Sequence, residues 1–186
     1  MKKIVIFASG SGSNAEKIIL HFKNSTFGNV VAVFTNNLHA KVLEKAKNLG
    51  VATHIFDREA LNSGEVLEKI NAIQPDLIVL AGFLWKFPEN IIKEYPNKVV
   101  NIHPALLPKY GGKGMYGMHV HQAVLDNKET ETGITIHFVN EHYDEGGIIF
   151  QQTVNIEDCK TAECIAEKVH ALEHQYFPKV IERLLG

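Results

Sequence analysis

Lys3-Ile4-Val5-Ile6-Phe7-Ala8 runs directly into Ser9-Gly10-Ser11-Gly12-Ser13-Asn14, and this joining of an apolar run to a glycine-rich turn decides the fold. We interpret the run as a strand and the residues after the turn as a helix, with Ser13 or Asn14 as its N-cap. The apolar residues at helical spacing in this helix are Ile18, Ile19 and Phe22. The glycines allow a tight turn close to an anion, and the helix N-terminus adds free N–H groups and a partial positive charge.

The turn Gly10-Ser11-Gly12-Ser13-Asn14-Ala15 also has the spacing of a dinucleotide fingerprint, G-x-G-x-x-A. That fingerprint needs an acidic residue after the second strand to bind a ribose hydroxyl, and the segment found there is Phe34-Thr35-Asn36-Asn37. Because the acid is missing, the sequence favours a phosphate monoester over NAD as the ligand. The alternative is a plain tight turn that binds nothing.

Strand and helix patterns alternate along the first half of the chain. The expected strands are Lys3–Ala8, Val30–Phe34, Val51–Phe56, Leu77–Leu80 and Lys98–Ile102. The expected helices, after the one that follows the glycine turn, are Val42–Leu49, Val66–Ile73 and Pro88–Tyr95. Leu77–Leu80 is continuously apolar, as in a strand buried on both faces of a parallel sheet. The alternation predicts an α/β fold with a doubly wound, mostly parallel sheet.

The pattern changes after Pro104. A loop over 104–117 is followed by a helix over 120–125, strands over 133–139 and 148–154, and a helical pattern over 161–185. The two strands have no helix between them and can pair as an antiparallel addition. Pro178 should kink or break the last helix. We expect one domain over 1–186, with a phosphate-binding, Rossmann-like half (1–103) and a C-terminal half (104–186).

Composition narrows the class of protein. A net charge of -2 and a pI near 6.5 give no basic footprint for nucleic acid. No apolar stretch reaches the roughly 18 residues that a membrane helix needs. Cys159 and Cys164 form no C-x-x-C, so we expect reduced thiols on a helix in a reducing compartment. We therefore expect a soluble cytoplasmic protein, a monomer or homodimer, that acts on small molecules and binds neither nucleic acid nor membrane.

Catalytic candidates cluster around Val99-Val100-Asn101-Ile102-His103-Pro104. Alternation puts Asn101 and His103 on one face of this strand, and Pro104 ends it. Asp144 follows in Asp144-Glu145-Gly146-Gly147. A carboxamide, an imidazole and a carboxylate can stabilise an oxyanion and move a proton. The alternative is a satisfied core Asn and His beside a turn aspartate.

Two further groups of residues carry weaker indications. Phe83, Trp85 and Phe87 follow the fourth strand and could form an apolar slot for a flat heterocycle, although such aromatic residues often only cover a sheet edge. His119 and His121 lie two apart on an expected helix and would not share a metal easily. We interpret them as surface or capping histidines and expect no metal.

The chain resembles the folate-dependent formyltransferases along essentially its whole length. The motifs that carry the resemblance are Ser9–Asn14, Val79–Phe83, Asn101–Tyr110, Gly133–Val139, Asp144–Ile149 and Glu173-His174. The Asn-Ile-His-Pro run and the later Asp-x-Gly are common to formyl transfer enzymes of this fold. The glycine loop is more specific and is similar to the phosphoribosylglycinamide formyltransferase branch, which belongs to purine biosynthesis.

The resemblance implies that 10-formyltetrahydrofolate, as a co-substrate, gives its formyl group to the amine of glycinamide ribonucleotide, without a metal. Asn101 would donate a hydrogen bond to the tetrahedral oxyanion. His103, held protonated by Asp144, would donate to it as well and help to protonate the leaving nitrogen. The implied ribotide ligands are Gly12, Ser13, Asn14, His170 and Glu173. The implied folate ligands are Arg58, Leu84, Trp85, Lys86, Phe87, Asn101, Asn140, Glu141, His142, Tyr143 and Asp144.

The sequence departs from this family pattern in several places. Ala105 stands where Ser is common, Trp85-Lys86 replaces an Arg-Ile pair, and His170 replaces Gln. The loop Lys109–Gly117 is longer than usual. Because it contains four glycines, we expect it to be mobile and to become ordered over bound substrate.

Three other functions stay open at this point. Formyl transfer to initiator methionyl-tRNA is associated with an extra C-terminal nucleic-acid-binding domain, and formyltetrahydrofolate hydrolysis with an extra N-terminal regulatory domain; we expect neither domain here. The third is a binding module for a phosphate ligand that catalyses no reaction. Mutation of His103 separates an enzyme from such a module, because the module has no turnover to lose.

Overall fold

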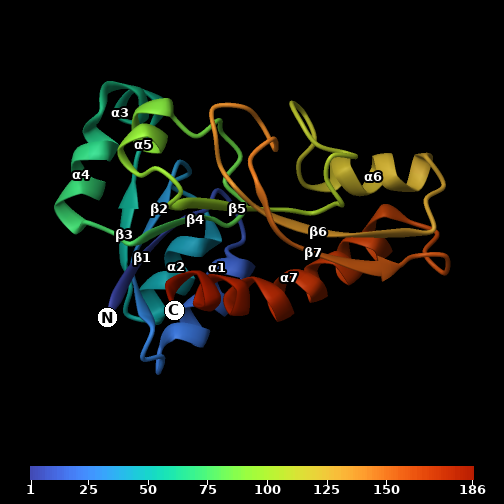
Figure 1. Cartoon of the computed structure of the whole chain (residues 1–186), viewed down its shortest axis with the longest axis horizontal. Coiled ribbons are helices and arrows are strands. Elements are labelled where there is room, and N and C mark those ends of the chain that lie inside the picture. The colour runs from blue at the N-terminus through green and yellow to red at the C-terminus, as the bar shows by residue number, and fades with distance from the viewer.

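A computed structural model describes residues 1–186 and is built on one seven-stranded sheet with helices on both faces (Figure 1). The elements are β1 (Lys2–Phe7), α1 (Ser13–Phe22), β2 (Gly28–Thr35), α2 (Lys41–Asn48), β3 (Ala52–Ile55), α3 (Arg58–Ser63), α4 (Glu65–Ile73), β4 (Leu77–Leu80), α5 (Glu89–Glu94), β5 (Val99–His103), α6 (Met118–Asp126), β6 (Glu131–Phe138), β7 (Ile148–Asn155) and α7 (Ala162–Leu185). The strand order is β3-β2-β1-β4-β5-β6-β7. Strands β1 to β5 are parallel, and β6 runs antiparallel to both β5 and β7. The expected mostly parallel sheet with an antiparallel C-terminal addition is confirmed.

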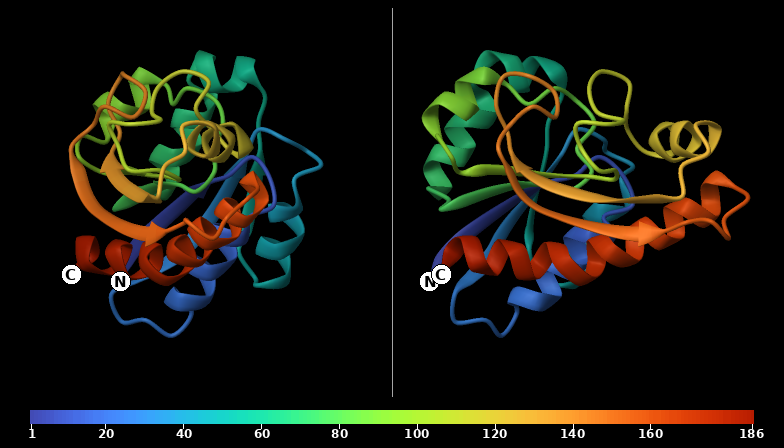
Figure 2. Two further views of the ribbon diagram at one scale, coloured as in Figure 1. Left: turned by 90° about the vertical axis from the view of Figure 1, so that its right-hand side faces the viewer. Right: turned by 45° about the vertical axis from the view of Figure 1, so that its right-hand side comes forward.

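Each face of the sheet has its own core, because alternate residues of a strand point to opposite sides. Ile4 and Ile6 of β1 pack in the core beneath α1, α2 and α7. Val5 and Phe7 pack in the core beneath α3, α4 and α5. Figures 1 and 2 show these two sets of helices on either side of the sheet. With both faces covered, the carboxyl ends of the parallel strands are where a ligand can reach the sheet.

The antiparallel strand β6 completes the surroundings of β5. In the β5–β6 pair, Asn101 lies opposite His137 and His103 lies opposite Thr135. The Thr135 hydroxyl donates to the carbonyl of Ala105 at 2.7 Å and accepts from the amide of Leu107 at 3.0 Å. These bonds hold the backbone that follows β5, so the position of the His103 Cα is fixed at the end of the strand.

The helices differ from the sequence expectations at three places: the cap of α1, the presence of α3, and the absence of a break at Pro178. Helix α1 has Gly12 at its N-cap and no side-chain cap, because Gly12 adopts a left-handed φ of 70° and starts the helix one residue earlier. Helix α3 was not expected; Asp57 caps it by accepting from the amide of Ala60 at 2.8 Å. Helix α7 continues through Pro178. Phe177, Val180 and Ile181 are buried around this proline, and their burial outweighs the loss of one backbone hydrogen bond.

The expected pair of reduced thiols was also wrong, because Cys159 and Cys164 form a disulfide. Cys159 lies before α7 rather than on it, in a turn in which its amide donates to the carbonyl of Ile156 at 2.9 Å. This turn brings the two Cα atoms to 5.5 Å, a usual separation for a disulfide. Among the helices, none has both the length and the apolar composition needed to cross a bilayer.

Candidate functional site

One cavity of about 560 Å³ opens at the carboxyl ends of β1, β4 and β5. It joins the glycine turn after β1, the aromatic segment after β4 and the polar end of β5. The sequence-predicted site residues that line it are Gly12, Ser13, Asn14, Leu84, Trp85, Lys86, Phe87, Asn101, His103, Asn140, Glu141, His142, Tyr143, Asp144, His170 and Glu173. Three strand ends and two distant loops therefore meet in a single hollow, as is usual for ligand sites in open α/β sheets.

The glycine turn forms one end of this cavity. Gly12 has a φ of 70°, and a Cβ atom there would lie 2.5 Å from the Cβ of Val42. Only glycine therefore allows α2 to pack against the turn. The amides of Ser13, Asn14 and Ala15 have no backbone acceptor, because they belong to the first turn of α1. These free N–H groups, at the positive end of the α1 dipole, suit an anionic oxygen.

Asn14 and Glu173 connect the glycine turn to α7. The side-chain Nδ2 of Asn14 donates to Oε2 of Glu173 at 2.8 Å. Glu173 is only 6% exposed, and burial raises its pKa, although the hydrogen bond from Asn14 opposes the rise. The Oδ1 atom of Asn14 is buried without a partner. An unpaired acceptor beside a polar cavity indicates a place for a donor group of a ligand.

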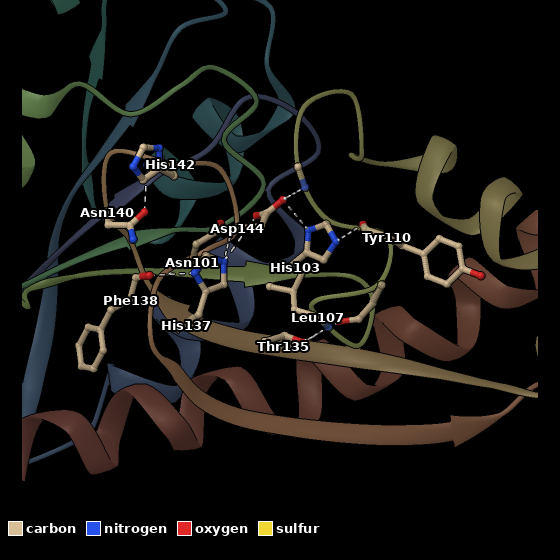
Figure 3. A network of polar contacts seen from close by, with 12 residues as sticks. Asn101, His103, Leu107, Tyr110, Thr135, His137, Phe138, Asn140, His142 and Asp144 are labelled. Carbon is tan, nitrogen blue, oxygen red and sulfur yellow. Dashed lines mark hydrogen bonds and ion pairs between the residues drawn. The ribbon is translucent and has the colours of Figure 1, made fainter.

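His103 lies at the end of β5 with both ring nitrogens in polar contact (Figure 3). Its Nε2 is 2.7 Å from the carbonyl oxygen of Tyr110, and its Nδ1 is 3.6 Å from Oδ2 of Asp144. The imidazole is 3% exposed. The structure therefore brings together the histidine and the carboxylate that the sequence predicts to act as a pair.

Opposing effects act on the protonation of His103. Burial lowers the pKa of His103, and this effect exceeds the opposing influence of the Asp144 carboxylate and of the Tyr110 carbonyl. Nearby His137 lowers it further. Burial therefore favours the neutral imidazole, whereas the Asp144 carboxylate favours the cation. A neutral imidazole can act as a general base, because it can accept a proton.

Asp144 is held by groups from two other segments. Burial alone would raise its pKa, but contacts with His137, with His103 and with the amide of Gly112 together hold the pKa of this carboxyl below its ordinary value. The Gly112 amide donates to Oδ2 at 3.0 Å, and Oδ1 lies 3.6 Å from Nε2 of His137. Asp144 is therefore ionised near neutral pH, and its charge favours a cation on His103 once a proton arrives.

His137 is a site residue that the sequence reasoning missed. Its Nδ1 donates to the carbonyl of Phe138 at 2.9 Å, so Nε2 accepts when the ring is neutral and can face Asp144 as a donor only when the ring is protonated. The Nδ2 of Asn101 lies 3.1 Å from this Nε2 and donates to it (Figure 3). The sequence feature that could have identified His137 is its position in the middle of an apolar strand. That feature indicates a site residue only once β6 is known to pair with β5.

The aromatic segment after β4 forms another wall of the cavity. Phe87 is buried and packs edge-on against Phe7, whereas Leu84 is 50% exposed at the cavity mouth. Trp85 contacts both Phe56 and Phe83 in edge-on geometry. Its exposed rim therefore offers an apolar surface to a flat group.

Arg58 does not line the cavity, unlike the other expected folate ligands. It starts α3, and its guanidinium carbon lies 4.3 Å from the centre of the Trp85 ring. This cation–π contact holds a positive charge at the outer edge of the aromatic wall.

His121 was expected at the surface, and this was wrong. It is 2% exposed and lines the cavity, whereas His119 is exposed. Burial, with the nearby His170 as a second cause, lowers the pKa of His121 to about 4. The two rings of His121 and His170 lie perpendicular, with their centres 6.3 Å apart. No cluster of three or more His, Cys, Asp and Glu side chains has the geometry to hold a metal ion.

The chain belongs to the formyl transferase family, whose model matches residues 2–181. It is similar to a phosphoribosylglycinamide formyltransferase of Bacillus subtilis, with 33% identity over 100% of this chain and 96% of that protein. The chloroplastic enzyme of the same name from Arabidopsis thaliana is 37% identical over 97% of this chain, and this chain spans 64% of its length. The crystal structure of glycinamide ribonucleotide transformylase 1 from Geobacillus kaustophilus matches with a TM-score of 0.91 and 33% identity, covering 100% of both chains.

Proposed function

We propose that this protein transfers the formyl group of 10-formyltetrahydrofolate to the amine of glycinamide ribonucleotide. The observation that carries the proposal is the meeting of Asn101, His103 and Asp144 in the cavity that also contains the glycine turn. An oxyanion donor, a base and an anion site are the three parts that this reaction needs. The names of the relatives support formyl transfer to this ribotide.

The ribotide end of the cavity is the glycine turn. The free amides of Ser13 and Asn14 would bind the phosphate, with Gly12 allowing its close approach. His170 and Glu173 lie one helical turn apart on α7 and line the same end. They would face the ribose, where hydroxyl groups can both donate and accept.

The folate end is the aromatic wall. The rim formed by Leu84, Trp85 and Phe87, with Lys86, would take the flat ring system. The loop from Asn140 to Asp144 would close the other side of that ring. Arg58, stacked on Trp85, would meet the acidic tail of the co-substrate from outside the cavity.

The chemistry follows from the protonation states of the site. The neutral His103 imidazole takes the proton that the amine loses as its nitrogen bonds to the formyl carbon. Asn101 donates to the oxyanion, and Asp144 stabilises the new imidazolium. His103 then returns the proton to the folate nitrogen as the bond from that nitrogen to the formyl carbon breaks. One C–N bond forms, one breaks, and a proton passes from one nitrogen to the other.

The test is an assay of the purified chain with 10-formyltetrahydrofolate and three acceptors. We expect formyl transfer to glycinamide ribonucleotide and none to methionyl-tRNA, with little loss of the formyl group to water alone. Turnover without the ribotide would assign a hydrolase instead. Tight ribotide binding with no turnover on any acceptor would assign a binding module.

A further inference from the structure

The first residues of the long loop lie directly against the His103–Asp144 pair. The carbonyl oxygen of Tyr110 is 2.7 Å from Nε2 of His103, and the amide of Gly112 donates to Oδ2 of Asp144 at 3.0 Å. A segment three residues long therefore contacts both members of the pair. Figure 3 shows Tyr110 and Asp144 on opposite sides of the imidazole.

The backbone at Tyr110 has an unusual conformation. Its φ is 55°, in the left-handed region that a bulky residue seldom adopts. Such a conformation persists only where the surroundings hold it. It is also the conformation that points the Tyr110 carbonyl at the ring of His103.

Glu129, in the connection between α6 and β6, holds Tyr110 in place. The Tyr110 hydroxyl donates to Oε1 of Glu129 at 2.8 Å, and Nζ of Lys109 lies 3.0 Å from the same oxygen. Burial and the contact with Glu129 raise the pKa of Tyr110 to about 12, so the phenol keeps its proton. The hydrogen bond to a carboxylate is of the stronger, charge-assisted kind.

The Tyr110 carbonyl also decides which nitrogen of His103 carries the proton. A carbonyl oxygen can only accept, so Nε2 must be the protonated nitrogen of the neutral ring. The remaining nitrogen, Nδ1, lies on the side of Asp144. A proton that the ring accepts therefore arrives at Nδ1, and Asp144 is the anion beside it.

We propose that Glu129 is a positioning residue for His103: it fixes Tyr110, whose carbonyl sets the Nε2–H tautomer and leaves Nδ1 as the nitrogen that exchanges the proton. The expected effect on the rate rests on the proposed function, whereas the tautomer of His103 can be measured on the protein alone. Glu129 touches neither the cavity nor His103, so it acts only through Tyr110.

The first measurement is the tautomer. The histidine rings of the full chain are labelled with ¹⁵N, and two-bond nitrogen–proton correlation spectra are recorded across a pH range. The His103 signals are identified by their absence from His103→Gln. We expect the Nε2–H form in the native chain, and a mixture of tautomers with a lower pKa in Tyr110→Phe and Glu129→Ala. A predominant Nδ1–H form in the native chain would overturn the proposal.

The second measurement is steady-state formyl transfer by the same variants. Tyr110→Phe keeps the carbonyl and removes only the hydroxyl. We expect it to lower kcat about ten- to hundredfold, with KM for the ribotide nearly unchanged, because a catalytic group is displaced and no substrate contact is lost. The acidic limb of the kcat/KM profile should move to lower pH with the pKa of His103.

Two matched variants separate positioning from a general effect on folding. Glu129→Gln keeps an Oε1 acceptor for the phenol and should restore most of the activity lost in Glu129→Ala. Lys109→Met removes the other partner of Glu129 and should leave the rate and the pH profile at native values. Equal losses in Glu129→Gln and Glu129→Ala, or native kinetics and tautomer in Tyr110→Phe, would overturn the proposal. A native chain that shows the Nε2–H form but transfers no formyl group would refute the proposed function and leave the tautomer assignment standing.

Discussion

Asn101 on β5 and His137 on β6 are direct partners across the antiparallel ladder, and their side chains are joined at 3.1 Å. The carbonyl of Phe138 fixes the His137 ring, so the ring accepts a hydrogen bond from the Asn101 amide. This contact uses one of the two hydrogens on Nδ2 and leaves the other for the cavity. The orientation of the Asn101 side chain is thus set by the strand next to it.

We predict that His137→Ala lowers kcat about ten- to hundredfold with a smaller change in KM, because Asn101 loses the acceptor that orients it. The same change leaves a buried amide unpaired and should lower the free energy of unfolding by about 1–3 kcal/mol. Rate measurements and urea denaturation on one preparation check both effects. Native kcat would show that Asn101 does not depend on His137.

His103→Ala should remove most formyl transfer, by a factor of about 10²–10⁴, while ribotide binding stays close to native. The reason is the proposed division of roles in the cavity, in which the imidazole would move the proton and the glycine turn would bind the phosphate. Calorimetric titration with the ribotide and rate measurement on the same variant decide this. Near-native turnover would refute the role given to His103.

Asp144→Asn should lower the rate and move the acidic limb of the pH profile to lower pH. The Asp144 charge raises the pKa of His103, so its removal lets burial lower that pKa further. The base form of His103, which exists above its pKa, would then persist to lower pH, but the imidazolium formed during transfer would be less stable. A pH–rate profile unchanged in position contradicts this coupling.

Gly12→Ala should both weaken ribotide binding and destabilise the protein. The new Cβ would meet Val42 at 2.5 Å and would impose a φ that alanine disfavours. Gly50→Ala is the matched control, because Gly50 has a φ of 76° but no atom within 4 Å of its Cβ position. We expect Gly12→Ala to lose about 1–3 kcal/mol more of unfolding free energy than the control, from overpacking. Equal losses in the two variants would show that the contact with Val42 is unimportant.

Ligand binding should affect the two ends of the loop Lys109–Gly117 differently. Lys109 and Tyr110 are anchored to Glu129, so their exchange rates should change little when ligand binds. Residues 113–117 have few hydrogen bonds and include glycines of positive φ, so their amides should gain protection when both substrates are bound. Hydrogen exchange with and without ligands tests this difference. Uniform behaviour from 109 to 117 would contradict it.

Much of the candidate site could be predicted from local patterns. Alternation in β5 places Asn101 and His103 on one face whatever surrounds them, and the chemistry of a glycine turn before a helix indicates an anion site. Arg58 lies outside the cavity lining, and the sequence gives no sign that its guanidinium stacks on Trp85. His121 was expected at the surface, because helical spacing alone does not say which side packs against α7.

The sequence by itself determined the doubly wound sheet, the phosphate turn and the identity of the residues at the end of β5, because each depends on the periodicity or backbone freedom of neighbouring residues. Only the tertiary structure brings His137 to Asn101, the Tyr110 carbonyl to His103, and Cys159 to Cys164. It also places His103 where burial lowers its pKa, because a pKa reflects the burial and charges contributed by every segment packed around the group.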